Sequence, residues 1–198
     1  MEKKYSMIIT PPESISSQIK DKAQNVRNVV DFDPHINLHS SFLSNGTEFI
    51  EKARYWLKEQ DPFFFTLRKI DRFPRTSIVY LTSDDETEVE GIRELYFGLQ
   101  SLLDKEIKVK DNFCKFFPHL TLDSPHPCRN IKKILSRYRR YFENPIPMPI
   151  VKVDVAEKIG YLRWEKIDCL TIGNDENNKQ LVITGSYQFG DNRRASVV

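Results

Sequence analysis

The chain has 198 residues, of which 29% are charged and 39% hydrophobic, and its formal net charge is +2. This length is enough for one large domain or two small lobes with a buried core, and the composition excludes a disordered tail. The mild basicity excludes a protein that holds long nucleic acid mainly by electrostatics, whereas a short or single-stranded nucleotide ligand is compatible with it.

The first half of the chain predicts strands and helices in alternation, followed by a hairpin. Apolar residues return at helical spacing from Ser14 onwards, and a proline at position 34 ends that pattern before the next β-type run. Two phenylalanine-rich and β-branched runs then follow, separated by Pro74-Arg75-Thr76. We expect, in order, a strand over residues 5–10, a helix from residue 14, a strand after residue 34, a helix over 49–57, and an antiparallel hairpin of 63–73 with 77–81.

The second half repeats a helix and a strand and then becomes β-rich. An acidic turn at 83–86 predicts a helix start, because negative charge complements the helix dipole. We expect a helix after that turn, a strand near residue 120, a basic helix over 130–142, and strands over 150–155, 167–172 and 181–189, the last two forming a closing hairpin. This order indicates an α+β fold in a single domain, residues 1–190, with a loose tail over 191–198.

Two short segments share one pattern: proline, histidine, apolar residue, small polar residue, leucine. They are Pro34-His35-Ile36-Asn37-Leu38 and Pro118-His119-Leu120-Thr121-Leu122, and their histidines are 84 residues apart. In an extended strand, alternate side chains share a face, so each segment presents its histidine and its polar residue together. Two such strands facing one another would enclose a cleft suited to acid and base chemistry on a phosphate ester.

The distribution of histidines supports a functional interpretation of this pair. A single histidine in an apolar strand is more often a structural residue than a catalyst. The chain has only four histidines, however, and all of them lie in or beside the two matching segments: His35, His39, His119 and His126. Histidines that meet in a cleft usually perform acid–base or ligand chemistry, so the matched pair favours catalysis.

These segments resemble the motifs of the 2H phosphoesterase superfamily, the group of 2′-5′ RNA ligases and cyclic-nucleotide phosphodiesterases. Its mark is two copies of His-x-Thr/Ser-x flanked by apolar residues. The resemblance covers most of the chain and implies a bilobal α+β fold, in which two antiparallel sheets with outer helices face each other across a central groove. Each sheet would then contribute one histidine motif. Asn37 departs from the pattern, since it stands where the family usually has threonine or serine.

The resemblance also implies an activity and roles for the motif residues. The expected enzyme is a metal-independent phosphodiesterase acting on 2′,3′-cyclic phosphate or 2′-5′ bonds of RNA or oligonucleotides, with RNA ligation as a related activity. His35 and His119 would be the catalytic acid and base, in either order, and Asn37 and Thr121 would hold the phosphate oxygens. No cofactor or metal is expected. The expected partner is an RNA or nucleotide substrate, with no membrane and no obligate protein partner.

Two alternatives concern the first motif. Residues 38–42 also satisfy the His-x-Ser pattern, but Pro34 and Leu38 mirror Pro118 and Leu122, which favours His35 as the motif histidine. Strand alternation places His39 and Ser41 on the face of His35, so we expect them to contact substrate at the cleft edge. Asn37 also leaves open a non-catalytic 2H-fold protein that binds RNA or nucleotides through a degenerate first motif.

Other features indicate a different ligand or partner less strongly. The cysteines Cys114, Cys128 and Cys169 are odd in number and have no framework spacing, which predicts free thiols in a reducing compartment. A zinc site formed by two of these cysteines with His119 and His126 competes for the second motif, but its spacing matches no common site. The basic helix could bind a partner, although a solvated outer face is commoner. The N-terminal apolar run is too short for a signal or a membrane span, so we expect a cytoplasmic protein.

Overall fold

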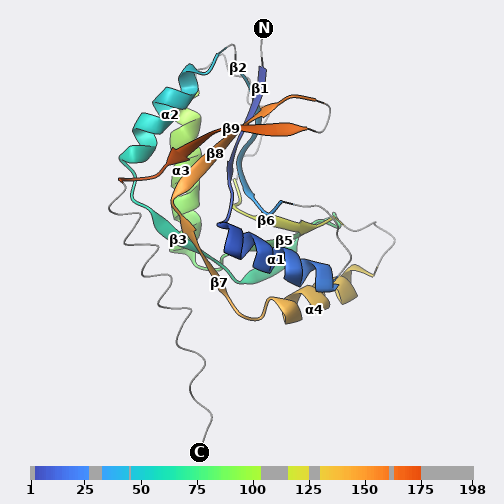
Figure 1. Cartoon of the computed structure of the whole chain (residues 1–198). Coiled ribbons are helices and arrows are strands. Elements are labelled where there is room, and N and C mark those ends of the chain that lie inside the picture. The colour runs from blue at the N-terminus through green and yellow to red at the C-terminus, as the bar shows by residue number, and fades with distance from the viewer. Residues whose placement is uncertain are drawn as a thin grey trace, which may run out of the picture.

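The computed structural model describes residues 3–26, 33–44, 46–103, 116–124, 130–160 and 163–174. These residues form nine strands and four helices (Figure 1). In chain order the elements are β1 (Lys3–Ile9), α1 (Glu13–Val26), β2 (Ile36–Ser44), α2 (Glu48–Lys58), β3 (Phe63–Leu67), β4 (Lys69–Arg72), β5 (Val79–Thr82), α3 (Glu86–Leu102), β6 (Leu120–Asp123), α4 (Ile131–Tyr141), β7 (Ile146–Ile150), β8 (Lys152–Lys158) and β9 (Trp164–Thr171).

The strands form two antiparallel sheets, which confirms the predicted α+β class. The larger sheet has the order β4-β5-β6-β2-β1-β8-β9, and β3 pairs with β7 in the smaller one. Among the residues that the structure describes, β2 and β6 are joined through one residue pair, Ile36 with Leu120. This narrow junction divides the sheet into a wing of β4, β5 and β6 and a wing of β2, β1, β8 and β9.

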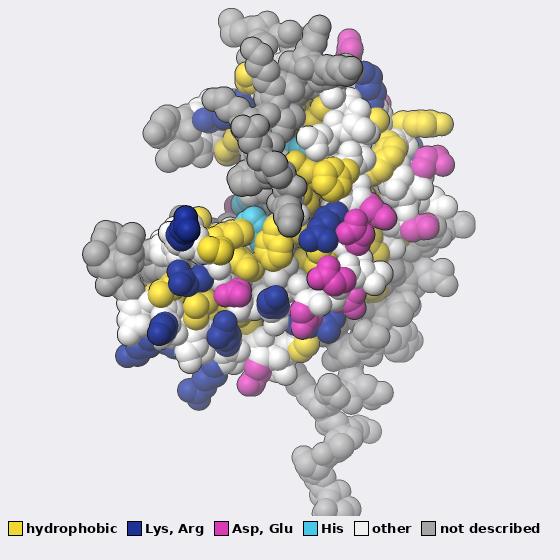
Figure 2. All heavy atoms as spheres, turned by 180° about the vertical axis from the view of Figure 1, so that it is seen from behind, with side chains coloured by type: hydrophobic (Ala, Val, Ile, Leu, Met, Phe, Trp, Pro, Cys, Tyr) yellow, Lys and Arg dark blue, Asp and Glu magenta, His cyan; other side chains and the backbone are white. Residues whose placement is uncertain are grey.

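The helices cover these sheets with their apolar sides. In α3, the buried residues recur at helical spacing, and Asp85 caps the first turn by accepting from the backbone N–H groups of Thr87 and Glu88. That cap confirms the predicted start at the acidic turn. In α4, Ile134, Leu135 and Tyr138 are buried. Its lysines and arginines are exposed, namely Lys132, Lys133, Arg137, Arg139 and Arg140. Figure 2 shows basic side chains gathered at that end of the molecule.

The predicted hairpin of 63–73 with 77–81 is partly wrong. The long run divides at Arg68, whose backbone N–H donates to Thr82 O and whose guanidinium lies 3.0 Å from Asp84. Only β4 forms the hairpin with β5, while β3 leaves to pair with β7. Phe65 and Leu67 still enter the core, as their alternation predicts. A run of β-type residues does not reveal such a division, because both halves have strand propensity.

The β-rich end confirms strands over 152–155 and 167–171, while the predicted closing hairpin of 167–172 with 181–189 stays a prediction. The run predicted over 150–155 is divided between β7 and β8 by Val151, and β8 forms an antiparallel pair with β9. The other predicted arm, residues 181–189, and the predicted tail over 191–198 lie outside the described residues. The single-domain boundary at residue 190 stays a prediction. None of the helices described is long and apolar enough to cross a membrane.

Candidate active site

The two histidine motifs lie on neighbouring strands of one sheet. Ile36 pairs with Leu120, and both side chains are fully buried on the core side. Because the strands are antiparallel, this register sets His35 opposite Thr121 and Asn37 opposite His119, all four on the other face. The expectation that each sheet contributes one motif is therefore wrong. Both motifs instead lie on either side of the Ile36–Leu120 pair, where the two wings of one sheet join.

Both imidazoles are held in the same way. Nδ1 of His35 lies 2.7 Å from Asp33 O, and Nδ1 of His119 lies 2.8 Å from Phe117 O. A carbonyl oxygen can only accept, so each Nδ1 carries the proton and each Nε2 is left for proton exchange. In each motif the carbonyl belongs to the residue two positions before the histidine.

The intervening prolines explain why this arrangement repeats. Pro34 and Pro118 are buried. A proline has a fixed φ and restricts the preceding residue to extended conformations, which limits where the preceding carbonyl can point. A further bond anchors the second motif, since Thr82 Oγ1 donates to Pro118 O at 2.7 Å. The proline in each motif thus helps to orient the imidazole that follows it.

The polar residue of each motif differs in its surroundings. Asn37 is half-buried, and its Nδ2 lies 3.3 Å from His35 Nε2. In this orientation the amide donates to a neutral imidazole, and the reversed amide would accept from a protonated one. Thr121 is exposed on β6. Both side chains carry a hydrogen-bond donor, and their role as phosphate contacts stays a prediction.

His119 lies among aromatic rings. Phe73 meets its ring edge-on at 4.7 Å between centroids, and Tyr80 and Phe117 lie at 5.9 and 6.3 Å. Burial lowers the pKa of His119, the hydrogen bond to Phe117 opposes that effect, and charge on His35 lowers it further. The two imidazoles are therefore electrostatically coupled. At neutral pH the structure favours the neutral, proton-accepting form of His119.

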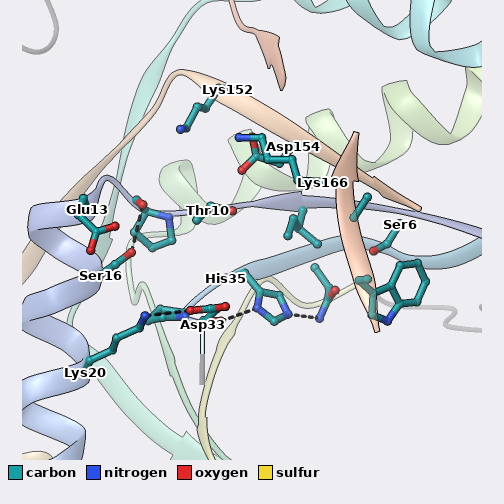
Figure 3. Close-up of a pocket in the computed structure, with 16 residues that line it drawn as sticks. Ser6, Thr10, Glu13, Ser16, Lys20, Asp33, His35, Lys152, Asp154 and Lys166 are labelled. Carbon is teal, nitrogen blue, oxygen red and sulfur yellow. Dashed lines mark hydrogen bonds and ion pairs between the residues drawn. The ribbon is translucent and has the colours of Figure 1, made fainter. Parts of the chain in front are cut away.

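A cavity of about 810 Å³ adjoins the first motif (Figure 3). Its floor is one face of the wing that contains β2, β1, β8 and β9, and α1 forms a side wall. His35 and Asn37 line the cavity, whereas His119 and Thr121 do not. The second motif lies instead across the β2–β6 junction. The cavity therefore leads away from the paired histidines, along the face of the other wing.

His39 does not contact this cavity, so its predicted place at the cleft edge is wrong. Its side chain is fully buried, stacks on Tyr96 of α3 at 4.6 Å, and has Nε2 3.2 Å from Tyr96 O. The reason is a register shift in β2: Met7 pairs with His39, but Ile8 pairs with Asn37. The extra residue interrupts the alternation and turns His39 towards the core. The side chain of Ser41 lies outside the described residues.

The zinc alternative cannot be followed through the described residues, since Cys114, His126 and Cys128 lie outside them. Within the described ranges no three His, Cys, Asp or Glu residues are grouped as metal ligands. Cys169 is described and is an exposed free thiol.

Sequence reasoning missed the charged walls of the cavity. Lys166 of β9 lies 2.7 Å from the carboxylate of Asp154, whose side chain is 4% exposed. Burial raises the pKa of Asp154, but hydrogen bonds with Lys166, Thr10 and Cys169 outweigh it, so its pKa lies below the usual value. Lys152 and Asp154 alternate along β8, which is a weak signal of a polar face. Nothing local shows that this face adjoins the first motif.

Comparison with known proteins agrees with this geometry. The family model described as the 2′-5′ RNA ligase superfamily matches residues 11–158. The chain belongs to this superfamily. Its members are phosphoesterases and ligases, so membership supports an enzymatic role in phosphoester chemistry. The match includes both histidine motifs and the strands β2, β6 and β8 of the site, whereas β1 precedes it.

Solved structures share the 2H phosphoesterase fold. Apo LigT from E. coli is 17% identical, with a TM-score of 0.58, and the alignment covers 88% of this chain and 99% of LigT. E. coli LigT complexed with 3′-AMP is 15% identical, with a TM-score of 0.59 and coverage of 87% and 99%. A protein described only as a phosphoesterase is 14% identical, with a TM-score of 0.59 and coverage of 88% and 100%. At these identities the likeness shows the fold. A comparison with curated proteins gave no match.

Proposed function

We propose that this chain is a metal-independent phosphodiesterase that cleaves 2′,3′-cyclic phosphate or 2′-5′ phosphodiester bonds of RNA or nucleotides. The observation that carries the proposal is the antiparallel pairing of the two motifs, which sets His35 and His119 on one face with matched Nδ1 bonds. Two imidazoles can supply both proton transfers that such a reaction needs. The 3′-AMP bound by LigT is consistent with a nucleotide substrate. We expect a cytoplasmic location, which the exposed thiol of Cys169 fits.

His119 is the proposed general base. Its lowered pKa favours the neutral form, and Nε2 is the nitrogen left to accept a proton. A water oxygen would attack phosphorus while Nε2 of His119 takes the proton of that water. The bond from phosphorus to the leaving ribose oxygen then breaks, and Nε2 of His35 gives that oxygen a proton. Ligation would run the same transfers in reverse, with the two roles exchanged.

Asn37 and Thr121 are the proposed phosphate contacts. Each lies opposite the histidine of the other motif, so a phosphoryl group between the imidazoles has one donor on each side. Hydrogen bonds to the non-bridging oxygens would stabilise negative charge as it develops in the transition state. Asn37 also contacts His35 Nε2. An amide in place of a hydroxyl therefore retains the donor that the chemistry requires.

The test is turnover of nucleoside 2′,3′-cyclic phosphates and 2′-5′-linked oligoadenylates in EDTA. We expect His35→Ala and His119→Ala each to lower kcat by about 10²- to 10⁴-fold, the usual contribution of a positioned acid or base, with unchanged thermal unfolding. Lys133→Ala, on the exposed face of α4, is the matched control and should keep full activity. Because the pKa of His119 is lowered, the acid limb of kcat/KM should lie below pH 6.5, the ordinary histidine value.

Two results would contradict this function. Wild-type activity in both histidine variants would show that the reaction does not use the imidazoles. Nucleotide binding without turnover of any substrate would support the alternative, a non-catalytic 2H-fold protein in which Asn37 marks a degenerate first motif.

A further inference from the structure

The cavity beside His35 contains one lysine whose charge is not already compensated. Lys20 lies 2.8 Å from Asp33, and Lys166 lies 2.7 Å from Asp154. Lys152 of β8 also lines the cavity, and within the described part of the chain its side chain forms neither an ion pair nor a hydrogen bond. An unpaired ammonium in a ligand-sized cavity is suited to an anionic group of the ligand.

The sheet register places Lys152 relative to the catalytic histidine. Ile8 of β1 pairs with Asn37 of β2 on one side and with Asp154 of β8 on the other. His35 precedes Asn37 by two residues, and Lys152 precedes Asp154 by two. Because β2 and β8 both run antiparallel to β1, these two steps go in the same direction. His35 and Lys152 therefore lie two strands apart, about 10 Å between Cα atoms at the usual strand spacing, and point to the same face.

The close-up shows the space between them. Lys152, Asp154 and Lys166 lie along one side of the cavity, and His35 with Asp33 and Lys20 lies along the other (Figure 3). Its volume of about 810 Å³ is within the range of small-molecule sites and is larger than a single phosphate requires. A ligand with its reacting phosphate at His35 would thus extend across the sheet towards Lys152.

We propose that Lys152 binds a second phosphate of the substrate, on the 5′ side of the nucleoside whose 2′ or 3′ phosphate reacts at His35 and His119. This inference rests on the proposed function and specifies its substrate class: nucleotides or RNA ends that bear a 5′ phosphate group, in preference to plain nucleoside cyclic phosphates. The ammonium acts as a point charge on a flexible stem, and a charge-assisted hydrogen bond to phosphate is among the stronger polar contacts.

The other charged residues of the cavity fit this role less well. Lys166 is paired with a carboxylate that is almost fully buried, and release of Lys166 would leave that carboxylate without its cationic partner. Glu13, in the first turn of α1, lines the same cavity and accepts from Ser17 Oγ at 3.3 Å. The negative charge of Glu13 repels an anion bound beside Lys152. Removal of Glu13's charge should therefore strengthen binding of the second phosphate, while removal of Lys152's charge should weaken it.

The experiment measures binding, which does not depend on turnover. Adenosine 3′-phosphate and adenosine 3′,5′-bisphosphate are titrated into the protein by calorimetry in low salt. We expect the bisphosphate to bind about tenfold more tightly, the equivalent of about 1.4 kcal/mol. Lys152→Met should abolish that preference without weakening adenosine 3′-phosphate, and Glu13→Gln should increase it. Lys158→Met is the matched control, since Lys158 lies on the same strand but outside the cavity, and it should leave the preference unchanged.

A second arm distinguishes the source of the phosphate. In an adenylyl dinucleotide with a 3′-phosphate, the phosphate on the 5′ side of the 3′-terminal nucleoside is a diester. This diester carries less negative charge than the 5′ monoester of adenosine 3′,5′-bisphosphate. If Lys152→Met weakens binding of both ligands, the site recognises the phosphate within a nucleotide chain. If it weakens binding of the bisphosphate alone, the site recognises a 5′-terminal phosphate. Equal affinity of wild-type protein for the 5′-phosphorylated and unphosphorylated ligands would overturn the inference even if cyclic phosphates are hydrolysed. A Lys152-dependent preference without any turnover would instead sustain it and refute the proposed catalysis.

Discussion

The ion pair on the cavity floor offers a direct test of how the site is stabilised. Asp154 is 4% exposed and Lys166 is 51% exposed at the side chain, and their charged atoms are 2.7 Å apart. Lys166→Met removes the cation and keeps most of the stem. The carboxylate is then left buried, with hydrogen bonds from Thr10 and Cys169 as its remaining partners.

The cost follows from the burial of each partner. Loss of one partner from a fully buried pair costs about 3–5 kcal/mol, and an exposed pair contributes about 1 kcal/mol or less. Here one partner is buried and the other is half in solvent, so we expect a loss of about 2 kcal/mol in the free energy of unfolding. For a chain of this size that loss corresponds to a fall in Tm of about 4–8 °C.

The assay is urea unfolding followed by circular dichroism at several pH values. The pKa of Asp154 is lowered in the folded protein, so its stabilising effect is present above the ordinary aspartate value of 3.8 and is lost as pH falls through the folded value. In Lys166→Met, the loss in free energy of unfolding arises from the buried, ionised carboxylate of Asp154. It should therefore be largest at neutral pH and shrink in acid, as that carboxylate becomes protonated.

A double variant separates this explanation from a loss of packing. Asp154→Asn removes the buried charge and keeps hydrogen-bonding groups for Thr10 and Cys169. Combined with Lys166→Met, it should restore part of the stability that the single lysine variant loses. Equal penalties at pH 7 and in acid, or strictly additive effects in the double variant, would refute the electrostatic reasoning.

Two further substitutions test the packing of Gly98 against Trp56 and the chemistry of the candidate site. Gly98→Ala should destabilise the protein by about 1–3 kcal/mol, because its new Cβ would clash with the indole of Trp56. Gly46→Ala, whose new Cβ meets nothing within 4 Å, is the control in the same urea unfolding experiment. Asn37→Thr should keep or raise kcat/KM on cyclic phosphates, since a hydroxyl supplies the same donor. A steep loss there would show that the amide has a role of its own beside His35.

Much of the local structure can be predicted from the sequence, because it depends on local signals. The acidic turn before α3 and the helical spacing of Ile134, Leu135 and Tyr138 in α4 are contained within a few residues, and both predictions are confirmed. Alternation around His35 and His119 likewise predicts which side chains share a face. The paired motifs also identify the family, which the family model confirms.

The remaining features depend on distant residues. The shift that buries His39 arises from the pairing of β2 with β1, and no pattern within β2 shows it. Lys152 and Asp154 join the cavity because β8 pairs with β1, more than a hundred residues earlier in the chain. The division of the run at Arg68 has the same origin, since β3 pairs with β7. Local propensity predicts strands, but it does not predict their partners.

The bulged pairing of β2 with β1 also bears on how the first motif is placed beside the second. Register shifts occur on either side of Met7, and bulges increase the local twist of a strand pair. Among the described residues, β2 pairs with β6 only at Ile36 and Leu120. The proline-anchored histidines lie immediately beside that pair. The candidate site thus lies where two adjacent strands fix both imidazoles, next to the cavity that His35 and Asn37 line.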